Sequence, residues 1–306
     1  MTTAGSPTTG PPPTTPTAPA DADATAEAGL VGAAAPGRRR RPSVLTLVCA
    51  VLAALMAVAA VAGQWLLPDW DAQDLLTGVS MPGGGHPLGT DELGRDVAEM
   101  VVAGARSTLA GAALVALGSM LVGNALGLAA GYLGGWTDAV VRRWADLLLA
   151  LPALLVTIVV AGIGGGGYAV AVGVLVVLTS PGDTRLVRSA VLEQRHRAYV
   201  EAAETLGLSR TAVMVRHIWP NVLPVVVANT TLNFAGAVVT LSSLSFFGLG
   251  VPPGAPDWGR MLAENRTLLY DNPSAALAPA AAIIVCAVVL NLLGDRLFEA
   301  FSDRSS

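Results

Sequence analysis

Lysine is absent from this sequence, so all 18 of its basic residues are arginine. Charged residues of both signs are scarce, at 13% of the 306 residues, whereas 53% are hydrophobic. This balance is far from that of a soluble domain and indicates a membrane protein. The net charge of -4 and the lack of a basic stripe argue against nucleic acid as a partner.

Cysteine is nearly absent as well, and the two that occur, Cys49 and Cys286, each lie inside a long apolar run. Such surroundings offer no metal partner, so we interpret both as small core residues. The missing lysine also excludes an ATP site of the P-loop kind, because that motif needs a lysine to reach the β- and γ-phosphates. If ATP powers this protein, another polypeptide must hydrolyse it.

The amino-terminal residues 1–42 are rich in Pro, Thr, Ala and Gly and end in a basic cluster, a composition typical of a disordered tail. The next apolar run is long enough to cross a ~30 Å hydrocarbon core, which favours a retained helix over a signal peptide. We predict a first transmembrane helix over 43–67, an outer segment over 68–104, a membrane domain over 105–296 and a cytoplasmic tail over 297–306.

Six apolar runs predict an all-α integral membrane protein with about six transmembrane helices. The runs are Val44 to Leu67, Ser107 to Gly131, Leu147 to Ile163, Tyr168 to Ser180, Val222 to Phe247 and Ala275 to Leu293. The third and fourth are short and meet at a glycine run, Gly164 to Gly167, which is typical of a tight hairpin. We expect the fourth to continue past Pro181 as a helix that projects into water, because Arg185 and Arg188 follow directly.

The arginines predict the orientation of these helices. With the amino terminus inside the cell, 14 of the 18 basic residues lie on the inner side and four on the outer side. This asymmetry matches the positive-inside rule. We therefore expect a multi-pass protein of the bacterial cytoplasmic membrane with both termini in the cytoplasm.

No Asp, Glu, Lys or Arg is predicted near the centre of any run, which disfavours a carrier driven by protons or sodium. The fifth run is nevertheless rich in Asn and Thr. Its polar side chains could form hydrogen bonds between helices or line a path for a solute. The candidate path residues are Asn229, Thr230 and Asn233.

The longest inner connection runs from about Pro181 to Asn221 and predicts two short helices. Tyr199, Ala203 and Leu206 form a narrow apolar stripe on the first, which Gly207 ends. Ser209 can cap the second, which returns the chain to the membrane.

This connection resembles the EAA signature of permease subunits in ATP-binding-cassette importers, through Glu-Ala-Ala at 201–203, Gly207, Ile218 and Pro220. The resemblance implies a coupling helix that sits in a cleft on an ATPase subunit. It assigns docking to Glu201, Ala202, Ala203 and Gly207, and Tyr199 belongs to the same coupling loop. Trp219 departs from the leucine usual in the family, and we expect it to alter how the chain re-enters the membrane.

Between the first two runs the sequence reads HPLGTDELGRD from His86. Its His and acidic residues could be taken for a metal site, but glycines break the stretch into turns, and Thr90 or Asp91 can cap a helix beginning near Glu92. We therefore predict a structural role and no metal.

The same stretch resembles a segment of the second permease subunit of dipeptide, oligopeptide and nickel importers, as do GGWTDAVVRRWADLLLALPALL from Gly134, FFGLGVPPGAPDWGRMLAENR from Phe246 and LNLLGD from Leu290. A departure is SPGDTRLVR from Ser180. The two outer segments, the second of which runs from Gly250 to Asp271 and includes Asp257, hold ten acids against four arginines. We hypothesise that this acidic outer face docks a solute-binding protein and forms an outer gate, with the gate residues Gly89, Thr90, Asp91, Glu92, Gly94, Arg95, Asp96 and Trp258. The alternative is that the two outer segments pack on each other.

The resemblance implies the type I importer permease fold and a transport subunit that is not itself an enzyme. Its partners would be a homologous second permease, two ATPase subunits that bind ATP and Mg, an external solute-binding protein and the lipid bilayer, with no cofactor on this chain. Di- or oligopeptides are the expected solutes, and nickel or a metal chelate is the alternative. An ion-driven carrier and a membrane enzyme are rivals, although His86, His196 and His217 all lie outside the predicted spans.

Overall fold

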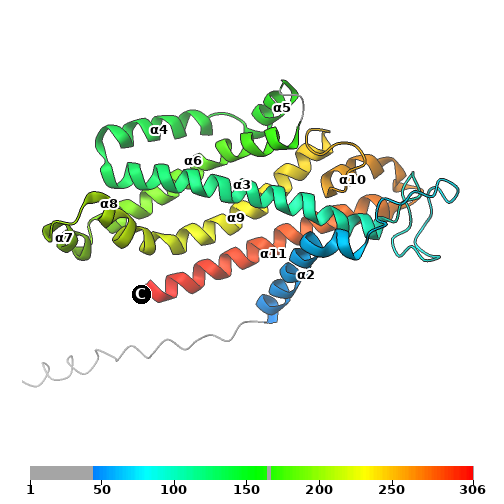
Figure 1. Cartoon of the computed structure of the whole chain (residues 1–306), viewed down its shortest axis with the longest axis horizontal. Helices are drawn as coiled ribbons and strands as arrows, with labels where there is room; N and C mark the ends of the chain where they lie inside the picture. The colour runs from blue at the N-terminus through cyan, green and yellow to red at the C-terminus, as the bar shows by residue number, and fades with distance from the viewer. Residues whose placement is uncertain (1–43, 164–166, 306) are drawn as a thin grey trace, which may run out of the picture. The chain divides into compact units, whose positions relative to one another are not determined.

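In a computed structural model of the chain, residues 44–163 and 167–305 are described, and the helices among them carry nearly all of the regular structure (Figure 1). The predicted tail over 1–42 and Gly164 to Gly166 of the predicted hairpin lie outside these residues. The elements are α2 (Val44–Leu66), α3 (Val97–Leu133), α4 (Gly135–Leu149), α5 (Ala153–Ile163), α6 (Tyr168–Arg195), α7 (Ala198–Thr205), α8 (Arg210–Val213), the π-helix η1 (Met214–Ile218), α9 (Trp219–Phe246), α10 (Trp258–Asn265), the 3-10 helix η2 (Arg266–Leu269) and α11 (Pro273–Ser305).

Membrane-length helices number five among the described residues, or six if one bent pair counts as a span. The prediction of about six is thus confirmed in outline. The bent pair is α4 and α5, which meet at 83°. Helix α5 has 11 residues and is about 16 Å long, too short to cross a ~30 Å core. The predicted third span from Leu147 to Ile163 is therefore not one continuous helix, because the chain bends sharply around Pro152.

Several helices extend beyond the predicted apolar runs. Helix α3 begins at Val97, inside the predicted outer segment. Helix α6 continues past Pro181 to Arg195, which confirms the predicted continuation of the fourth helix. Helix α11 continues to Ser305, into the residues predicted as a cytoplasmic tail. Hydropathy detects only the apolar part of each helix, whereas the hydrogen-bonded helix continues into its polar ends.

Pro181 lies inside α6, and the residue before it explains how the helix continues. A proline inside a helix has no N–H to offer the carbonyl four residues earlier, which for Pro181 is that of Val177. In α6 the hydroxyl of Ser180 donates to that carbonyl at 2.9 Å. The freed acceptor is satisfied by a side chain, so the helix passes through the proline.

Close packing of α3 on α6 organises the bundle (Figure 1). Three glycines of α3, Gly123, Gly127 and Gly131, face α6 at a spacing of four. A Cβ atom on Gly127 would lie 2.7 Å from Val187 Cβ, and one on Gly131 would lie 2.8 Å from Val191 Cβ. Small residues at this spacing allow two membrane helices to approach closely. The stripe therefore fixes the pair that carries the functional loop.

Two apolar clusters lie along this pair. The first gathers around Met100, Leu109 and Trp258 and includes parts of α9, α10 and α11. The second surrounds the C-terminal end of α3 and includes Tyr132 and Val191. Each cluster anchors one of the two motif-bearing regions of the chain.

Candidate functional site

The loop over 194–221 contains the two predicted short helices and the predicted signals that delimit them. Helix α7 ends before Gly207, which adopts a left-handed conformation with φ of 76°. Its N–H donates to the carbonyl of Glu204 at 3.0 Å. Ser209 caps α8 by accepting from the N–H of Ala212 at 3.3 Å. Both predictions are confirmed, because glycine C-caps and serine N-caps act locally.

The buried side of α7 differs from the predicted stripe. Val200 and Ala203 are buried, at 1% and 4% exposure, whereas Leu206 is 82% exposed and Tyr199 37% exposed. Of the predicted apolar stripe, Ala203 therefore packs inward, whereas Tyr199 and Leu206 remain exposed. An apolar side chain that remains exposed beside the motif is available to a partner protein.

The underside of α7 is bound firmly to the bundle. Val200 and Ala203 join the cluster that surrounds the end of α3. The Tyr132 hydroxyl of α3 donates to Glu204 at 2.9 Å. The Tyr199 hydroxyl donates to Gln194 Oε1 at 2.8 Å. Burial raises the pKa of the Tyr199 hydroxyl, so this hydroxyl remains a protonated donor at neutral pH.

The return from the loop is helical throughout. Helix α8, the π-helix and α9 follow one another without a break, and the whole stretch Arg210–Phe246 qualifies as one 37-residue span. Ile218 is fully buried at the end of the π-turn, and Pro220 occupies the first turn of α9, where its missing N–H costs little. Trp219 packs against the same cluster. A displacement of the loop can therefore be passed directly to α9.

The residues predicted to dock lie on the outside of this firmly held element. Glu201 and Ala202 are exposed, whereas Ala203 faces the bundle and Gly207 terminates the helix. No hydrogen bond or ion pair of the Glu201 carboxylate occurs within the described part of the chain. The loop thus offers a free carboxylate, a small side chain and the exposed Leu206 on one short rigid helix.

The 67–96 segment at the other end of α3 shows a different arrangement. Asp96, and neither Thr90 nor Asp91, is the N-cap, because the helix starts at Val97. Its carboxylate accepts from the N–H groups of Ala98 and Glu99, and its second oxygen lies 2.8 Å from His86 Nδ1. Among the described residues, no group of three or more His, Cys, Asp and Glu side chains could hold a metal.

A buried ion pair lies at the centre of this segment. Arg95 and Asp91 are 5% and 1% exposed, and Arg95 Nη2 lies 2.6 Å from Asp91 Oδ2. The same guanidinium reaches the carbonyl of Gly254 at 3.3 Å and lies 3.8 Å from Glu264. Thr90 is also buried, and the Thr267 hydroxyl donates to Glu92 Oε1 at 3.3 Å.

Two glycines of the 67–96 segment allow backbones to meet. Gly89 has φ of 73°, and a Cβ there would lie 2.2 Å from the carbonyl oxygen of Ser80. Gly94 has φ of 71°, and a Cβ there would lie 2.0 Å from that of Asp74. No other residue type fits these positions without moving the backbone. The predicted gate residues are therefore brought together, but mostly inside the fold.

Trp258 is buried as well, at 2% exposure, and its indole N–H donates to the carbonyl of Val101 at 2.7 Å. Its side chain therefore packs inside the fold, as the alternative of mutual packing expects, and docking of a solute-binding protein on this face stays a prediction. Asp257, one of the acids of the predicted outer face, caps α10 and accepts from Thr108 Oγ1 at 2.9 Å. Burial raises the pKa of its carboxyl.

Asp183 corrects the expectation that the helices hold no ionisable group in their interior. It lies in the extended part of α6 and is 4% exposed. Its Oδ1 accepts from the amides of Asn229 at 2.6 Å and Asn233 at 2.5 Å, both on α9. The sequence signal was the acidic residue two positions after Pro181, which was placed in water because the helix was expected to project into water beyond that proline.

The candidate path residues therefore have partners inside the chain. Asn229 and Asn233 form interhelical hydrogen bonds, one of the two predicted alternatives, and Thr230 donates to the carbonyl of Val226 at 2.8 Å. The three side chains are half-buried. Whether they also contact a solute stays a prediction.

Comparison with known proteins gives consistent results. Residues 123–306 match the family described as binding-protein-dependent transport system inner membrane component. The glutathione transport system permease protein GsiD of Pectobacterium atrosepticum is 35% identical over 244 residues, which cover 79% of this chain and 81% of the relative. That of Escherichia coli is 33% identical over 272 residues, covering 87% and 89%.

Solved structures show the fold. A chain of the MetNI methionine ABC transporter in inward-facing conformations superposes with a TM-score of 0.52 at 18% sequence identity. The match covers 66% of this chain and 96% of that chain. The helices described above therefore have the arrangement of a type I importer permease.

Proposed function

Because the chain belongs to the inner membrane components of binding-protein-dependent transport systems, as a permease subunit of the peptide family of ATP-binding-cassette importers, we propose that it passes small peptides inward under the control of ATPase subunits docked on its 194–221 loop. It is a transport subunit and not an enzyme. The observation that carries the coupling proposal is the geometry of α7, which is held to the bundle on one side and free on the other.

The mechanical argument begins at that loop. Val200 and Ala203 fix α7 to the cluster around the end of α3, so the loop cannot move alone. The continuous helix Arg210–Phe246 then connects the loop to the half-buried Asn229 and Asn233. A movement imposed by ATP binding on a docked ATPase would be delivered along α9 as a rigid-body change. This is the physical basis for alternating access.

The partners follow from the family and from what the chain lacks. Without lysine it has no P-loop, so ATP and Mg are expected on two ATPase subunits. A homologous second permease and an external solute-binding protein complete the proposed assembly. The arginine asymmetry supports cytoplasmic termini, which would place the 194–221 loop beside the ATPases.

Peptides are favoured as solutes because the curated relatives are described as glutathione transport permeases, and glutathione is a small peptide. An ion-driven carrier is no longer disfavoured by the absence of a buried carboxylate, since Asp183 is one. Membership in a binding-protein-dependent family is now the reason for rejecting it.

The coupling proposal is tested by Glu201→Lys and by Gly207→Trp in cells that express the whole transporter. We expect normal insertion of both variants, with loss of ATPase co-purification and of ATP-dependent peptide uptake. Glu299→Lys is the matched control, because Glu299 is also an exposed glutamate but lies on α11. Unchanged uptake and co-purification in the Glu201 and Gly207 variants would refute the docking role.

A further inference from the structure

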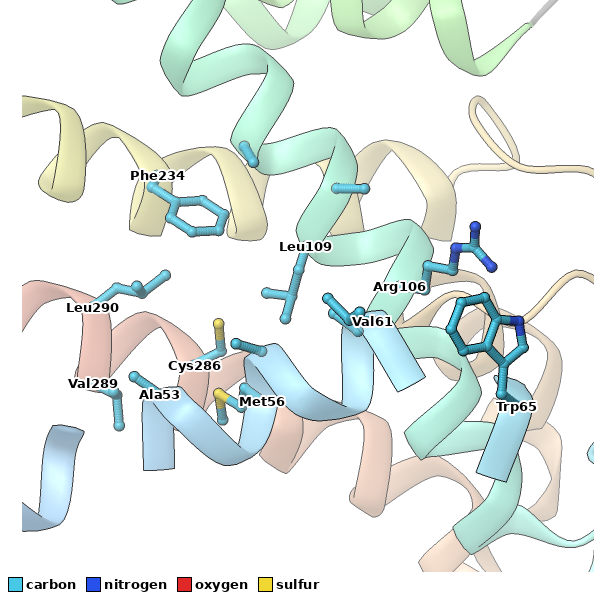
Figure 2. Close-up of a pocket in the computed structure, with 14 residues that line it drawn as sticks. Ala53, Met56, Val61, Trp65, Arg106, Leu109, Phe234, Cys286, Val289 and Leu290 are labelled. Atoms are coloured by element: carbon cyan, nitrogen blue, oxygen red, sulfur yellow. The ribbon is translucent and has the colours of Figure 1, made fainter. Parts of the chain in front are cut away.

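A cavity of about 510 Å³ lies between α2, α3, α9 and α11. Its lining is almost entirely apolar and includes Leu109, Phe234, Cys286 and Leu290 (Figure 2). Helix α2 forms one wall and is the least buried of the membrane-length helices. The cavity therefore opens toward the surroundings of the bundle, which for these apolar helices are lipid.

Small side chains on both walls create this space. Helix α2 contributes Ala53, Ala57 and Ala60, which are spaced by four and three residues and so lie on one face. Helix α3 contributes Ala110 and Ala113. In many membrane proteins, stripes of small residues let two helices approach closely. Here the alanines of α2 and α3 line a space that a narrow molecule can enter.

One end of the cavity is polar. Figure 2 shows Arg106 and Trp65 together at this end, away from Phe234, Val289 and Leu290. Arg106 is the only charged residue in the lining, and it donates to Gln64 Oε1 at 2.7 Å. No carboxylate forms an ion pair with it within residues 44–163 and 167–305. Trp65 is 79% exposed, and an indole in this position is typical of the membrane interface.

We propose that this cavity binds an anionic phospholipid, with an acyl chain between the alanine stripes and the phosphate against Arg106. An apolar slot with an uncompensated cation at the interfacial end matches an amphiphile with a negative head group.

Lipid binding is measured by native mass spectrometry of the full-length chain in detergent, titrated with dioleoylphosphatidylglycerol or dioleoylphosphatidylcholine. We expect phosphatidylglycerol to bind about fivefold more tightly, the preference that one arginine near the head group provides. Arg106→Gln should abolish this preference, while Arg143→Gln, which removes an exposed arginine of α4, should retain it. Retention of the preference in Arg106→Gln would overturn the proposal.

The acyl site is tested separately from the head-group site. Ala57→Phe should weaken the binding of both lipids at least fivefold by filling the slot. Ala54→Phe is the control, because Ala54 is on the same helix and exposed but does not line the cavity. Equal binding by both variants would overturn the proposal. So would Ala57→Cys forming crosslinks to another polypeptide in the assembled transporter, because protein would then fill the slot.

Discussion

In the 194–221 loop the motif residues Glu201 and Ala202 and the neighbouring Leu206 face outward, whereas in the 67–96 segment Asp91 and Arg95 are turned into the fold. Both regions adjoin α3, one at each end, and both carry specific sequence motifs. The first leaves its motif side chains exposed, and the second uses them to join segments distant in the sequence. A motif can therefore signal contact with another protein or contact within the chain, and burial decides which.

The largest expected effect comes from breaking the buried pair. Arg95→Met leaves Asp91 as an uncompensated buried charge, which should lower the free energy of unfolding by about 3–5 kcal/mol. Arg197→Met is the matched change in the loop, where the pair with Glu193 is more than half exposed on both sides. That variant should lose under ~1 kcal/mol. Thermal unfolding of the purified variants measures both, and equal losses would erase the contrast.

Two glycines sharpen the comparison. Gly94→Ala should destabilise the protein by about 2–3 kcal/mol, because its left-handed backbone and a clash with Asp74 act together. Gly207→Ala should cost only about 1 kcal/mol, since its backbone is also left-handed but nothing lies within 4 Å of the added Cβ. Denaturant unfolding distinguishes them, and a larger loss for the Gly207 variant would contradict the packing described here.

Substitutions of Leu206 and Trp258 should have opposite consequences, the first for affinity to the ATPase and the second for stability. Leu206→Ala removes an exposed side chain, so stability should change by less than ~0.5 kcal/mol, while affinity for the ATPase should fall about tenfold if the side chain is buried on docking. Trp258→Phe should lower stability through the lost bond to Val101 and leave that affinity unchanged. Melting temperature and co-purification test the pair, and a stability loss in Leu206→Ala would count against an exposed docking surface.

The smallest effect concerns pH. Because the pKa of Asp257 is raised in the folded state, that state binds the proton more tightly than the unfolded chain does. Stability from this group is greatest below the unfolded pKa of ~4 and falls as pH rises toward the folded pKa, by at most about 1.4 kcal/mol per unit. Asp257→Asn should flatten that slope in melting temperatures measured from pH 4 to 7. If melting temperature depends on pH in the same way in the unsubstituted protein and in Asp257→Asn, the Asp257 carboxyl does not cause the pH dependence of stability.

The elements predicted correctly depend on nearby residues. Gly207 and Ser209 delimit α7 and α8 as expected, because caps involve only the adjacent turn. The first span was predicted within one residue at its C-terminal end, since a long apolar run must match the bilayer. The sharp bend between α4 and α5 was not predicted, because both sides of Pro152 are apolar and hydropathy does not report direction.

Residue order alone determined the class of this protein: apolar runs of membrane length, local caps, the missing P-loop lysine and the EAA pattern all lie within short stretches of sequence. Tertiary structure alone decided that Trp258 is buried and Leu206 exposed, that Asp183 lies between α6 and α9, and that Asp91 pairs with Arg95 inside the fold. The reason is physical. Burial and pairing of a side chain can depend on a segment 175 residues away, as in the contact of Glu92 with Thr267, and no local pattern specifies such contacts.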